Sequence, residues 1–336
     1  MELSVLENVP LSQYVTLKTG GRARYFVTVC SIEELKAAVI FAEQKALPFF
    51  VLAGGSNLLV SDTGFNGVII KIGILGVEYI KEDDSVIEVK VGAGEVLDKL
   101  VAELASKNLW GVENLSHIPG TVGATPVQNV GAYGVEVSDV IKTVTVFDSE
   151  KKEIKIFSNT DCNFSYRHSV FKENNNFIIV AVNFCLSKIS QPKISYADLA
   201  VYNFFEPTPV QVREAIIKIR SQKFPDWEAV GTAGSFFKNP ILSKEEVKIL
   251  LSEYPMIPTY PAGPDHIKVS LGYILDKVCD LKGFRFGPIR LYENQALVLV
   301  ADKDATTNDI KNFVKIISDR VFEKTKIKIS QEVTNL

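Results

Sequence analysis

The stretch from Val112 to Gly134, VENLSHIPGTVGATPVQNVGAYG, determines how the rest of this chain has to be organised. It contains four glycines and two prolines among short apolar residues, with almost no charge. Glycine and proline at this density disfavour a regular helix or a central strand, because both disrupt the repeating backbone. A long segment of this kind is usually either functional or disordered, and its lack of charge argues against disorder. Two interpretations stay open: a backbone lining for a large planar or phosphorylated ligand, or a tightly packed structural crossover.

Length and charge exclude some classes of protein. The chain has 336 residues, which indicates roughly two domains of ~150 residues each. Hydrophobic residues make up 46% of it, so there is ample material for a buried core. The formal net charge is −3, with a pI near 5.8. A sequence-independent nucleic-acid binder normally has a basic face, so we expect no nucleic-acid partner.

The N-terminus, the apolar runs and the cysteine and histidine spacing bear on the location of the protein and on metal binding. The first ten residues, MELSVLENVP, have neither the basic start nor the apolar core of a signal peptide. No apolar run approaches the ~20 residues of a membrane helix. The four cysteines and three histidines lack paired or metal-ligand spacing; they are Cys30, Cys162, Cys185, Cys279, His117, His168 and His266. We therefore expect a cytoplasmic protein with free thiols, no metal site and no membrane partner.

A second glycine-containing turn lies near the N-terminus. Residues 49–53, FFVLA, are predicted to form a strand that ends in Gly54-Gly55-Ser56-Asn57. A strand followed by GGSN resembles a phosphate-binding turn, because glycines leave backbone N–H groups available to an anion. The sequence lacks both GxGxxG and GxxxxGK[ST], which disfavours a Rossmann fingerprint and a P-loop. Alone, GGSN is more often a plain turn than a phosphate-binding turn.

The remaining pattern favours the α+β class. Strands are predicted at 25–30, 68–71, 86–91, 143–147, 153–157 and 177–186. Helices are predicted at 31–45, 95–107, 209–223 and 306–324, with another beginning at Ser243. These elements lack the regular alternation of a doubly wound sheet. Residues 191–206 interrupt the pattern with tyrosine, phenylalanine and proline and are predicted to be a lid or linker.

Three further places carry polar residues that packing does not require. In FSYRH, Tyr166 and Arg167 stand together, and a guanidinium offers a planar fork suited to a carboxylate. In GTAGSFFKNP, Ser235 has no nearby His/Asp set, so it suits a proton donor or ligand contact better than a nucleophile. Glu332 follows a predicted strand near the C-terminus. Their structural alternatives are a surface arginine, a serine turn or cap, and a solvated terminal charge.

Five long motifs contain most of these features and are interpreted together. They are LAGGSNLLV, ENLSHIPGTVGATPVQNVGAYGVEV, FSYRHSVFK, AGSFFKNP and NQALVLV. Together they resemble the UDP-N-acetylenolpyruvoylglucosamine reductase family, in its longer form with a tyrosine-bearing loop. The resemblance runs from about Asn8 to Glu332, nearly the whole chain.

The resemblance implies a fold and a cofactor. The fold is a vanillyl-alcohol-oxidase-type (PCMH-type) FAD-binding domain of two α+β subdomains, followed by an α+β substrate-binding domain. The implied segments are 1–75, 76–208 with the tyrosine loop near 190–206, 209–327, and a final strand at 328–336 that carries Glu332. The residues implied to hold FAD are Gly54, Gly55, Ser56, Asn57, Leu58, Pro119, Gly120, Gly123, Ala124 and Gln128.

The resemblance also implies a reaction. NADPH would reduce FAD and leave, and UDP-N-acetylglucosamine enolpyruvate would then enter the same cleft. The flavin would pass hydride from N5 to the enolpyruvyl group, with Arg167 and a protonated Glu332 stabilising the developing charge and Ser235 donating the proton. The product would be UDP-N-acetylmuramate, a peptidoglycan precursor. The residues implied to surround the UDP-sugar are Tyr166, Tyr196, Lys223, Asn239, Tyr260, Lys282 and Gln295.

One departure and two alternatives accompany this interpretation. The family often ends in Glu-Val-Arg, whereas this chain has Glu332-Val333-Thr334, which leaves a supporting contact in doubt. A related FAD-dependent oxidase would reoxidise in air without a UDP-sugar. A non-catalytic UDP-sugar-binding flavoprotein would bind without turnover, but binding alone requires no proton donor beside a charge clamp. We expect a monomer.

Overall fold

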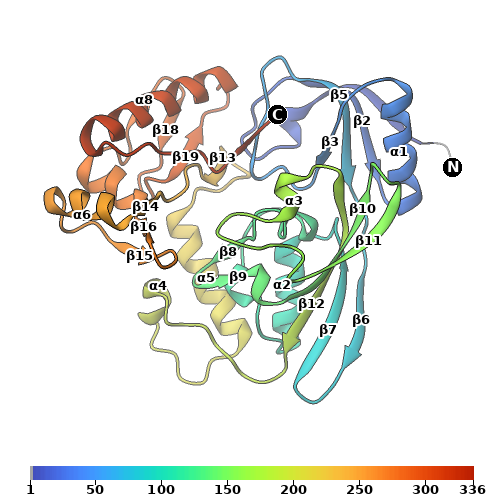
Figure 1. The fold of residues 1–336 in the computed structure, drawn as a ribbon, viewed down its shortest axis with the longest axis horizontal. Helices are drawn as coiled ribbons and strands as arrows, with labels where there is room; N and C mark the ends of the chain where they lie inside the picture. Colours follow the sequence, from blue (N-terminus) through green and yellow to red (C-terminus); the bar gives the residue numbers. More distant parts are fainter. Residues whose placement is uncertain (1–2) are drawn as a thin grey trace. The chain divides into compact units, whose positions relative to one another are not determined.

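The computed structural model describes residues 3–336 (Figure 1). The chain folds into two compact units. Each unit is assembled from separate stretches of sequence. Of the described residues, the first unit comprises 3–9, Ala23–Gly54 and Asn66–Arg220, and the second comprises Pro10–Arg22, Gly55–Phe65 and Ser221–Leu336. The predicted segments, with boundaries at 75, 208 and 327, are contiguous in sequence, whereas residues 10–22 and 55–65 belong to the second unit although their neighbours belong to the first. Those boundaries stay a prediction.

The first unit begins with a four-stranded sheet. Its strands are β1 (Val5–Pro10), β2 (Arg22–Val29), β3 (Phe49–Leu52) and β5 (Phe65–Ile72), in the order β1-β2-β5-β3. Strands β3 and β5 run parallel and pair through their backbones, with β3 at the edge of the sheet. Helix α1 (Ile32–Gln44) starts where Ser31 accepts the N–H of Glu34, as the sequence predicts. Its apolar face packs in the same core as β2 and β5.

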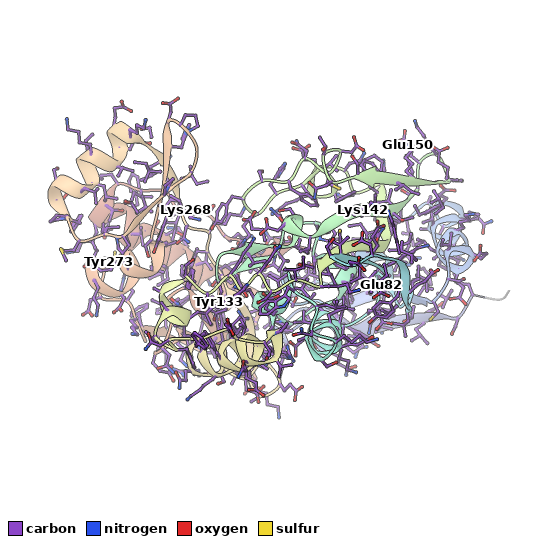
Figure 2. The ribbon with its side chains drawn as sticks, turned by 90° about the horizontal axis from the view of Figure 1, so that it is seen from below. Glu82, Tyr133, Lys142, Glu150, Lys268 and Tyr273 are labelled. Atoms are coloured by element: carbon purple, nitrogen blue, oxygen red, sulfur yellow. The ribbon has the colours of Figure 1, made fainter. Side chains whose placement is uncertain are left out.

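A five-stranded antiparallel sheet forms the other layer of this unit. Its strands are β6 (Val77–Glu82), β7 (Val86–Gly92), β10 (Ile141–Asp148), β11 (Glu153–Ser158) and β12 (Phe177–Ser187), in the order β11-β10-β12-β7-β6. Figure 2 marks this sheet through Glu82 on β6, Lys142 on β10 and Glu150 in the β10–β11 turn. Strand β12 is buried along most of its length because it lies at the centre of the sheet. Helix α2 (Leu97–Ser106) packs its Leu100 and Leu104 into the same core.

The glycine-rich stretch forms only short turns and bridges, as its composition predicts. These are the 3₁₀ turns η2 (Glu113–Leu115) and η3 (Val122–Ala124) and the two-residue strand β8 (Gly131–Ala132). Directly after the stretch come the strand β9 (Val135–Glu136), which pairs with β8, and the 3₁₀ turn η4 (Val137–Asp139). The helices that follow are α3 (Val170–Glu173), α4 (Ala197–Ala200) and α5 (Pro209–Lys223). Helix α5 has the bounds that the apolar periodicity predicted.

The second unit combines two small sheets with helices. One sheet has the order β13-β19-β18-β17, with β13 (Gly231–Ser235), β17 (Arg285–Phe286), β18 (Ile289–Leu291) and β19 (Val298–Ala301). The other has the order β14-β16-β15, with β14 (Ile241–Ser243), β15 (Thr259–Pro261) and β16 (His266–Val269). The helical segments are η1 (Leu11–Gln13), α6 (Lys244–Glu253), α7 (Leu271–Tyr273), the π-helix Ile274–Val278 and α8 (Thr307–Thr325). Capping boxes at Ser243 and Thr306 begin α6 and α8, because each side chain accepts an N–H of the first turn.

Helix α8 shows how the helices of this unit are used. Ile310, Phe313, Ile317 and Val321 are buried in the second core, whereas Lys315 and Asp319 pair on the exposed side. Such a helix is amphipathic. Within residues 3–336, no helix is long and apolar enough to cross a membrane.

The C-terminal segment differs from the sequence-based prediction. Glu332 was expected after a strand, but residues 326–330 form none. Ile327 and Ile329 instead pack into the second core, which accounts for their alternation without a partner strand. Pairing begins only at Gln331, which bridges to Phe237, and continues in β20 (Thr334–Asn335) beside β4 (Leu58–Leu59).

Candidate active site

The GGSN turn and the PGTVG stretch meet within the first unit. A Cβ added to Gly54 would lie 2.6 Å from the Cα of Gly120, so the two backbones touch where neither has a side chain. Gly120 has a φ of +128°, a conformation that L-residues rarely adopt. A Cβ on Gly123 would lie 2.6 Å from the Cβ of Ala93. The sequence therefore requires glycine here for close packing of backbone on backbone.

The polar atoms of this stretch fit a phosphorylated, hydrogen-bonding cofactor. Thr121 Oγ1 and Asn114 Oδ1 are buried and have no hydrogen-bond partner within the described residues. Buried polar atoms are normally satisfied, so each such atom calls for an explanation. A threonine hydroxyl can donate to a phosphate, and an amide oxygen can accept from a ring N–H. Pro119, Gly120, Gly123, Ala124 and Gln128 lie along the same stretch and are half-buried.

The second half of the GGSN turn belongs to the second unit. Gly55 is buried with a φ of +63°, and an added Cβ would lie 2.0 Å from the carbonyl oxygen of Tyr14. Thr16 donates its N–H to the Gly55 carbonyl at 3.1 Å. The Asn57 amide donates from Nδ2 to the Glu332 carbonyl at 3.3 Å. Leu58 is buried in β4. The turn is thus supported on one side by residues 14–16 and on the other by the C-terminal segment.

Ser235 owes its position to an irregularity in β13. The pairing with β19 follows one register at Gly231 and Thr232 and shifts before Ser235, which lies opposite Val298. Gly234, with a φ of +71°, donates its N–H to Thr232 Oγ1 at 3.2 Å. Extra residues of this kind bend a strand and re-aim the side chains beyond them. Two fully buried phenylalanines follow at once, so the bend that sets Ser235 is anchored in the core.

Ser235 and Glu332 are brought together although they are far apart in sequence. The N–H of Glu332 donates to the carbonyl of Phe236, the residue after Ser235, at 2.7 Å. Phe237 and Gln331 form an isolated bridge in the same pairing. Both Ser235 and Glu332 are half-buried. A hydroxyl and a carboxyl therefore lie on adjacent backbone segments of the second unit.

Tyr166 and Arg167 occupy the tip of a tight turn in the first unit. Ser165 and His168 exchange two N–H···O bonds of 3.1 Å each across it. Arg167 has a φ of 54°, which is uncommon for a residue with a side chain. Its guanidinium donates from Nη2 to the Gly131 carbonyl at 3.1 Å and lies 5.2 Å from the centre of the Tyr166 ring. Arg167 thus faces the glycine-rich stretch, unlike a surface arginine.

Two predicted substrate residues of the second unit have backbone partners. Asn239 Oδ1 accepts the N–H of Leu271 at 3.0 Å, at the start of α7. Gln295 Oε1 accepts the N–H of Leu297 at 3.3 Å, just before β19. These bonds orient both amides, and an oriented amide is a good ligand for a polar substrate.

The other predicted substrate residues of this unit are cationic or aromatic. Tyr260 is 47% exposed on β15, and the Lys268 ammonium lies 5.7 Å from the centre of its ring. Lys282 lies 3.6 Å from Asp276, and Lys223 is half-buried at the end of α5. Their grouping around one ligand stays a prediction.

The tyrosine loop, residues 190–206, contacts the glycine-rich stretch through Tyr196. The Tyr196 ring lies edge-on to Tyr133, with 5.4 Å between centres and an angle of 83°. Tyr133 packs against α5 (Figure 2). Burial raises the pKa of Tyr133 to about 12, although the nearby Arg220 lowers it, so this phenol stays protonated at neutral pH. Tyr196 itself is 46% exposed and available to a ligand.

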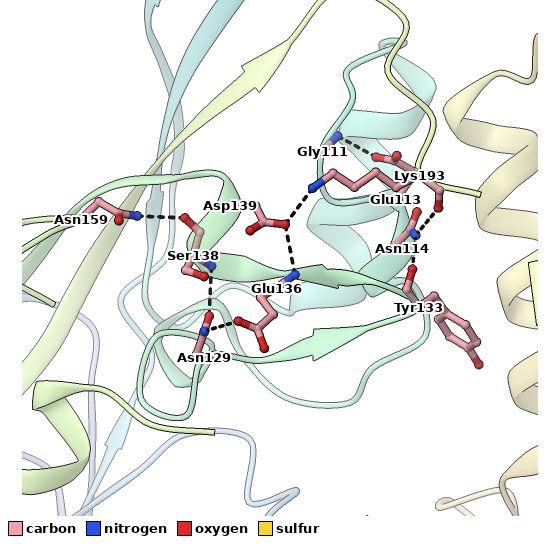
Figure 3. A network of polar contacts seen from close by, with 10 residues as sticks. All are labelled: Gly111, Glu113, Asn114, Asn129, Tyr133, Glu136, Ser138, Asp139, Asn159 and Lys193. Carbon is pink, nitrogen blue, oxygen red and sulfur yellow. Dashed lines mark hydrogen bonds and ion pairs between the residues drawn. The ribbon is translucent and has the colours of Figure 1, made fainter. Parts of the chain in front are cut away.

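Sequence reasoning missed a second contact of this loop, made by Asn114 (Figure 3). Its buried amide donates from Nδ2 to the carbonyls of Tyr133 and Lys193, each at 2.8 Å. The Lys193 ammonium also pairs with Asp139 at 2.8 Å. The available signal was an asparagine inside a glycine-rich stretch with almost no charge, where a side chain with two donors can join two loops.

Comparison with known proteins agrees with the fold and the cofactor. The FAD binding domain family matches residues 23–156. The family described as UDP-N-acetylenolpyruvoylglucosamine reductase, C-terminal domain, matches residues 225–336. The structure is also similar to a solved UDP-N-acetylenolpyruvylglucosamine reductase from Thermus caldophilus, with a TM-score of 0.68 and 26% identity over 100% of this chain and 99% of that one.

Full-length relatives are more similar in sequence. A UDP-N-acetylenolpyruvoylglucosamine reductase from Flavobacterium johnsoniae is 40% identical over 98% of this chain and 99% of its own length. One from Neisseria gonorrhoeae is 36% identical over 96% of this chain and 94% of its own. Identity of this level over the whole of both chains confirms the fold class predicted above. The chain belongs to the UDP-N-acetylenolpyruvoylglucosamine reductase family.

Proposed function

We propose that the chain reduces UDP-N-acetylglucosamine enolpyruvate to UDP-N-acetylmuramate for peptidoglycan precursor synthesis, with FAD as cofactor and NADPH as reductant. Family membership and the match to an FAD binding domain support this function. The observation that supports the chemistry is the bond of 2.7 Å from the Glu332 N–H to the Phe236 carbonyl, which joins the backbone of Glu332 to the segment that carries Ser235. Addition of a hydride and a proton across a carbon–carbon double bond requires a proton donor and a group that stabilises charge.

Ser235 is the proposed proton donor. FAD, when bound, would supply the two-electron chemistry that carries a hydride from NADPH to the enolpyruvyl group. The Ser235 hydroxyl then protonates the adjacent carbon, which as a carbanion is far more basic than the serine alkoxide. The bend at Gly234 and the buried phenylalanines that follow restrict the backbone from which the hydroxyl extends. A fixed donor needs no reorganisation during the reaction.

Glu332 and Arg167 are the proposed charge-stabilising groups. The carboxyl of Glu332, in its acid form, donates to the substrate carboxylate on which enolate charge develops. Arg167 offers a planar fork to the same kind of group, and its bond to the Gly131 carbonyl fixes the direction of the guanidinium. The strained backbone of Arg167 supports a functional role, because such conformations cluster at active sites.

The remaining assignments concern the nucleotide-sugar. Lys223 and Lys282 suit the diphosphate as point charges. The other proposed contacts of the UDP-sugar are Tyr166, Asn239, Tyr260 and Gln295, with Tyr196 closing over the bound substrate. We further propose that NADPH and substrate use one cleft in turn, and that the chain acts as a monomer in the cytoplasm.

Anaerobic absorption spectroscopy tests the function directly. NADPH is expected to bleach the flavin band of the purified protein, and the UDP-linked enolpyruvyl substrate is expected to restore it. A band that returns only when air is admitted would favour the oxidase alternative. Ligand binding without any bleaching would favour a non-catalytic flavoprotein.

The Ser235→Ala variant tests the proton donor. NADPH should bleach its flavin at the normal rate, while reoxidation by the substrate should slow by about 100-fold or more. Ser252→Ala is the matched control, because Ser252 is exposed on α6 and its hydroxyl donates only to the helix carbonyl of Ile249. Normal turnover in Ser235→Ala would remove this residue from the mechanism.

A further inference from the structure

We propose that Asn57 is a positioning residue that places Glu332 for the reaction. The sequence assigns Asn57 to the cofactor, together with the rest of GGSN. In the structure its side-chain amide donates to the Glu332 carbonyl at 3.3 Å, and its own carbonyl accepts the N–H of Thr334 at 3.1 Å. Asn57 thus contacts the chain on both sides of Val333. The inference rests on the proposed function in one respect, the catalytic role of Glu332.

Both backbone polar groups of Glu332 are used. Its N–H donates to the Phe236 carbonyl, beside Ser235, and its carbonyl accepts the Asn57 amide. One bond therefore ties Glu332 to the segment of the proposed proton donor, and the other ties it to the GGSN turn. The two peptide units that flank the Cα of Glu332 are each held by one hydrogen bond, which restricts rotation on both sides of that Cα. The direction in which the Glu332 side chain leaves the backbone is therefore set by these two partners.

The residues beyond Glu332 continue the same attachment. Strand β20 pairs in parallel with β4, with Thr334 opposite Leu58 and Asn335 opposite Leu59. Val333, between Glu332 and this strand, is 3% exposed and packs in the second core. All of these bonds are made by backbone groups, while the side chain of Thr334 is exposed. This explains how the chain can hold Glu332 although it has Glu-Val-Thr where the family often has Glu-Val-Arg.

The amide of Asn57 is the side-chain group that binds the Glu332 backbone to the GGSN turn. Aspartate has the same shape but no N–H, so it would direct a negative charge at the Glu332 carbonyl. Alanine would simply remove the donor. Neither change alters the backbone N–H groups of the GGSN turn, which are the groups suited to a pyrophosphate. A displacement of about 1 Å at a reacting centre can slow a reaction by ~100-fold, so the expected loss in the substrate half-reaction is about 10- to 100-fold.

The experiment compares Asn57→Ala and Asn57→Asp with Glu332→Gln and the control Ser252→Ala. Rapid-mixing absorption measures reduction by NADPH and reoxidation by the enolpyruvyl substrate separately, and flavin fluorescence measures the Kd for FAD. Asn57→Ala should keep the FAD affinity and the NADPH rate within about twofold, while its reoxidation slows by about 10- to 100-fold. Asn57→Asp should slow reoxidation further.

Other outcomes would overturn the inference. Loss of FAD from Asn57→Ala, with both half-reactions impaired, would make the side chain a cofactor ligand. A lower Tm with both rates unchanged would make its role purely structural. Normal reoxidation in Glu332→Gln would refute the proposed catalytic role of Glu332. Slow reoxidation in Glu332→Gln with normal Asn57→Ala would refute only the positioning role.

Thr334 provides a second, independent test. Thr334→Pro removes the N–H that donates to the Asn57 carbonyl, whereas Thr334→Val keeps it and changes only an exposed side chain. Thr334→Pro should reproduce the slow reoxidation of Asn57→Ala, and Thr334→Val should behave as the unmodified chain. Equal losses in both Thr334 variants would show that the side chain holds Glu332, contrary to the proposal.

Discussion

Replacing Asn114 with alanine is expected to weaken the attachment of the tyrosine loop. The Asn114 amide joins two segments through its Nδ2, donating to Tyr133 in the glycine-rich stretch and to Lys193 in the loop. The variant removes both donors and leaves two carbonyl oxygens without their partner. The loop then retains the ion pair of Lys193 with Asp139 and the ring contact of Tyr196 with Tyr133.

The magnitude follows from the burial of each acceptor. Tyr133 is 9% exposed, so water cannot readily replace the amide at its carbonyl, and the loss there is ~1–3 kcal/mol. Lys193 is exposed, so its carbonyl can be hydrated and only the net value of a hydrogen bond is lost, ~1 kcal/mol. The free energy of unfolding should fall by about 2–4 kcal/mol in total. The hydrogen bond to the Lys193 carbonyl, worth ~1 kcal/mol, is the one that holds the tyrosine loop. Its loss should raise the equilibrium constant for opening of that loop roughly fivefold.

Hydrogen exchange followed by mass spectrometry measures this opening, and urea unfolding measures the global loss. Amides in 190–206 should exchange about five times faster in Asn114→Ala. Lys193→Met is the matched control, because it removes only the exposed ion pair with Asp139, a change of ~0.2–1 kcal/mol. Unchanged exchange in 190–206 alongside a large global loss would show that the amide stabilises the core without anchoring the loop.

Two further predictions concern the glycine-rich stretch. Gly54→Ala should weaken FAD binding at least tenfold by flavin fluorescence, because its Cβ would lie 2.6 Å from the backbone of Gly120. An unchanged Kd for FAD would show that the close approach of these two backbones does not shape the cofactor site. Burial raises the pKa of Glu113 above its ordinary 4.5, so the folded chain binds that proton more tightly and stability is lost as pH rises through the folded pKa. Glu113→Gln should remove that loss. The free energy of unfolding, measured with urea between pH 4 and 8, would contradict this if it changed with pH in the same way for both proteins.

The regular elements were predictable because their signals are local. Helix α5 follows from an apolar stripe repeated every three or four residues, and α6 follows from a capping box within four residues. The absence of long elements from the glycine-rich stretch follows from its composition. Each of these signals lies inside the segment that it describes.

The geometry of the candidate site could not be predicted in the same way. The backbone of Glu332 pairs with that of Phe236, the residue after Ser235, although the two are almost 100 residues apart in the sequence. The pattern ISQEVTNL contains no sign of that partner. The strand predicted before Glu332 is also absent, because Ile327 and Ile329 pack in the second core without a partner strand. The motifs identified which residues matter, but long-range backbone pairing decides what they touch.

The GGSN turn illustrates how one short motif can serve two purposes. In the first unit Gly54 touches the PGTVG backbone, and in the second unit Asn57, three residues later, holds the backbone of Glu332. The family resemblance alone assigns both residues to FAD, but their contacts differ in kind: one is a close approach that only glycine allows, and the other is a side-chain hydrogen bond. The two should therefore separate by experiment. Gly54→Ala should impair both half-reactions through loss of flavin, whereas Asn57→Ala should impair only the reaction of bound reduced flavin with substrate. If the two variants gave the same pattern, the turn would have a single role, and Glu332 would owe its position to β20 alone.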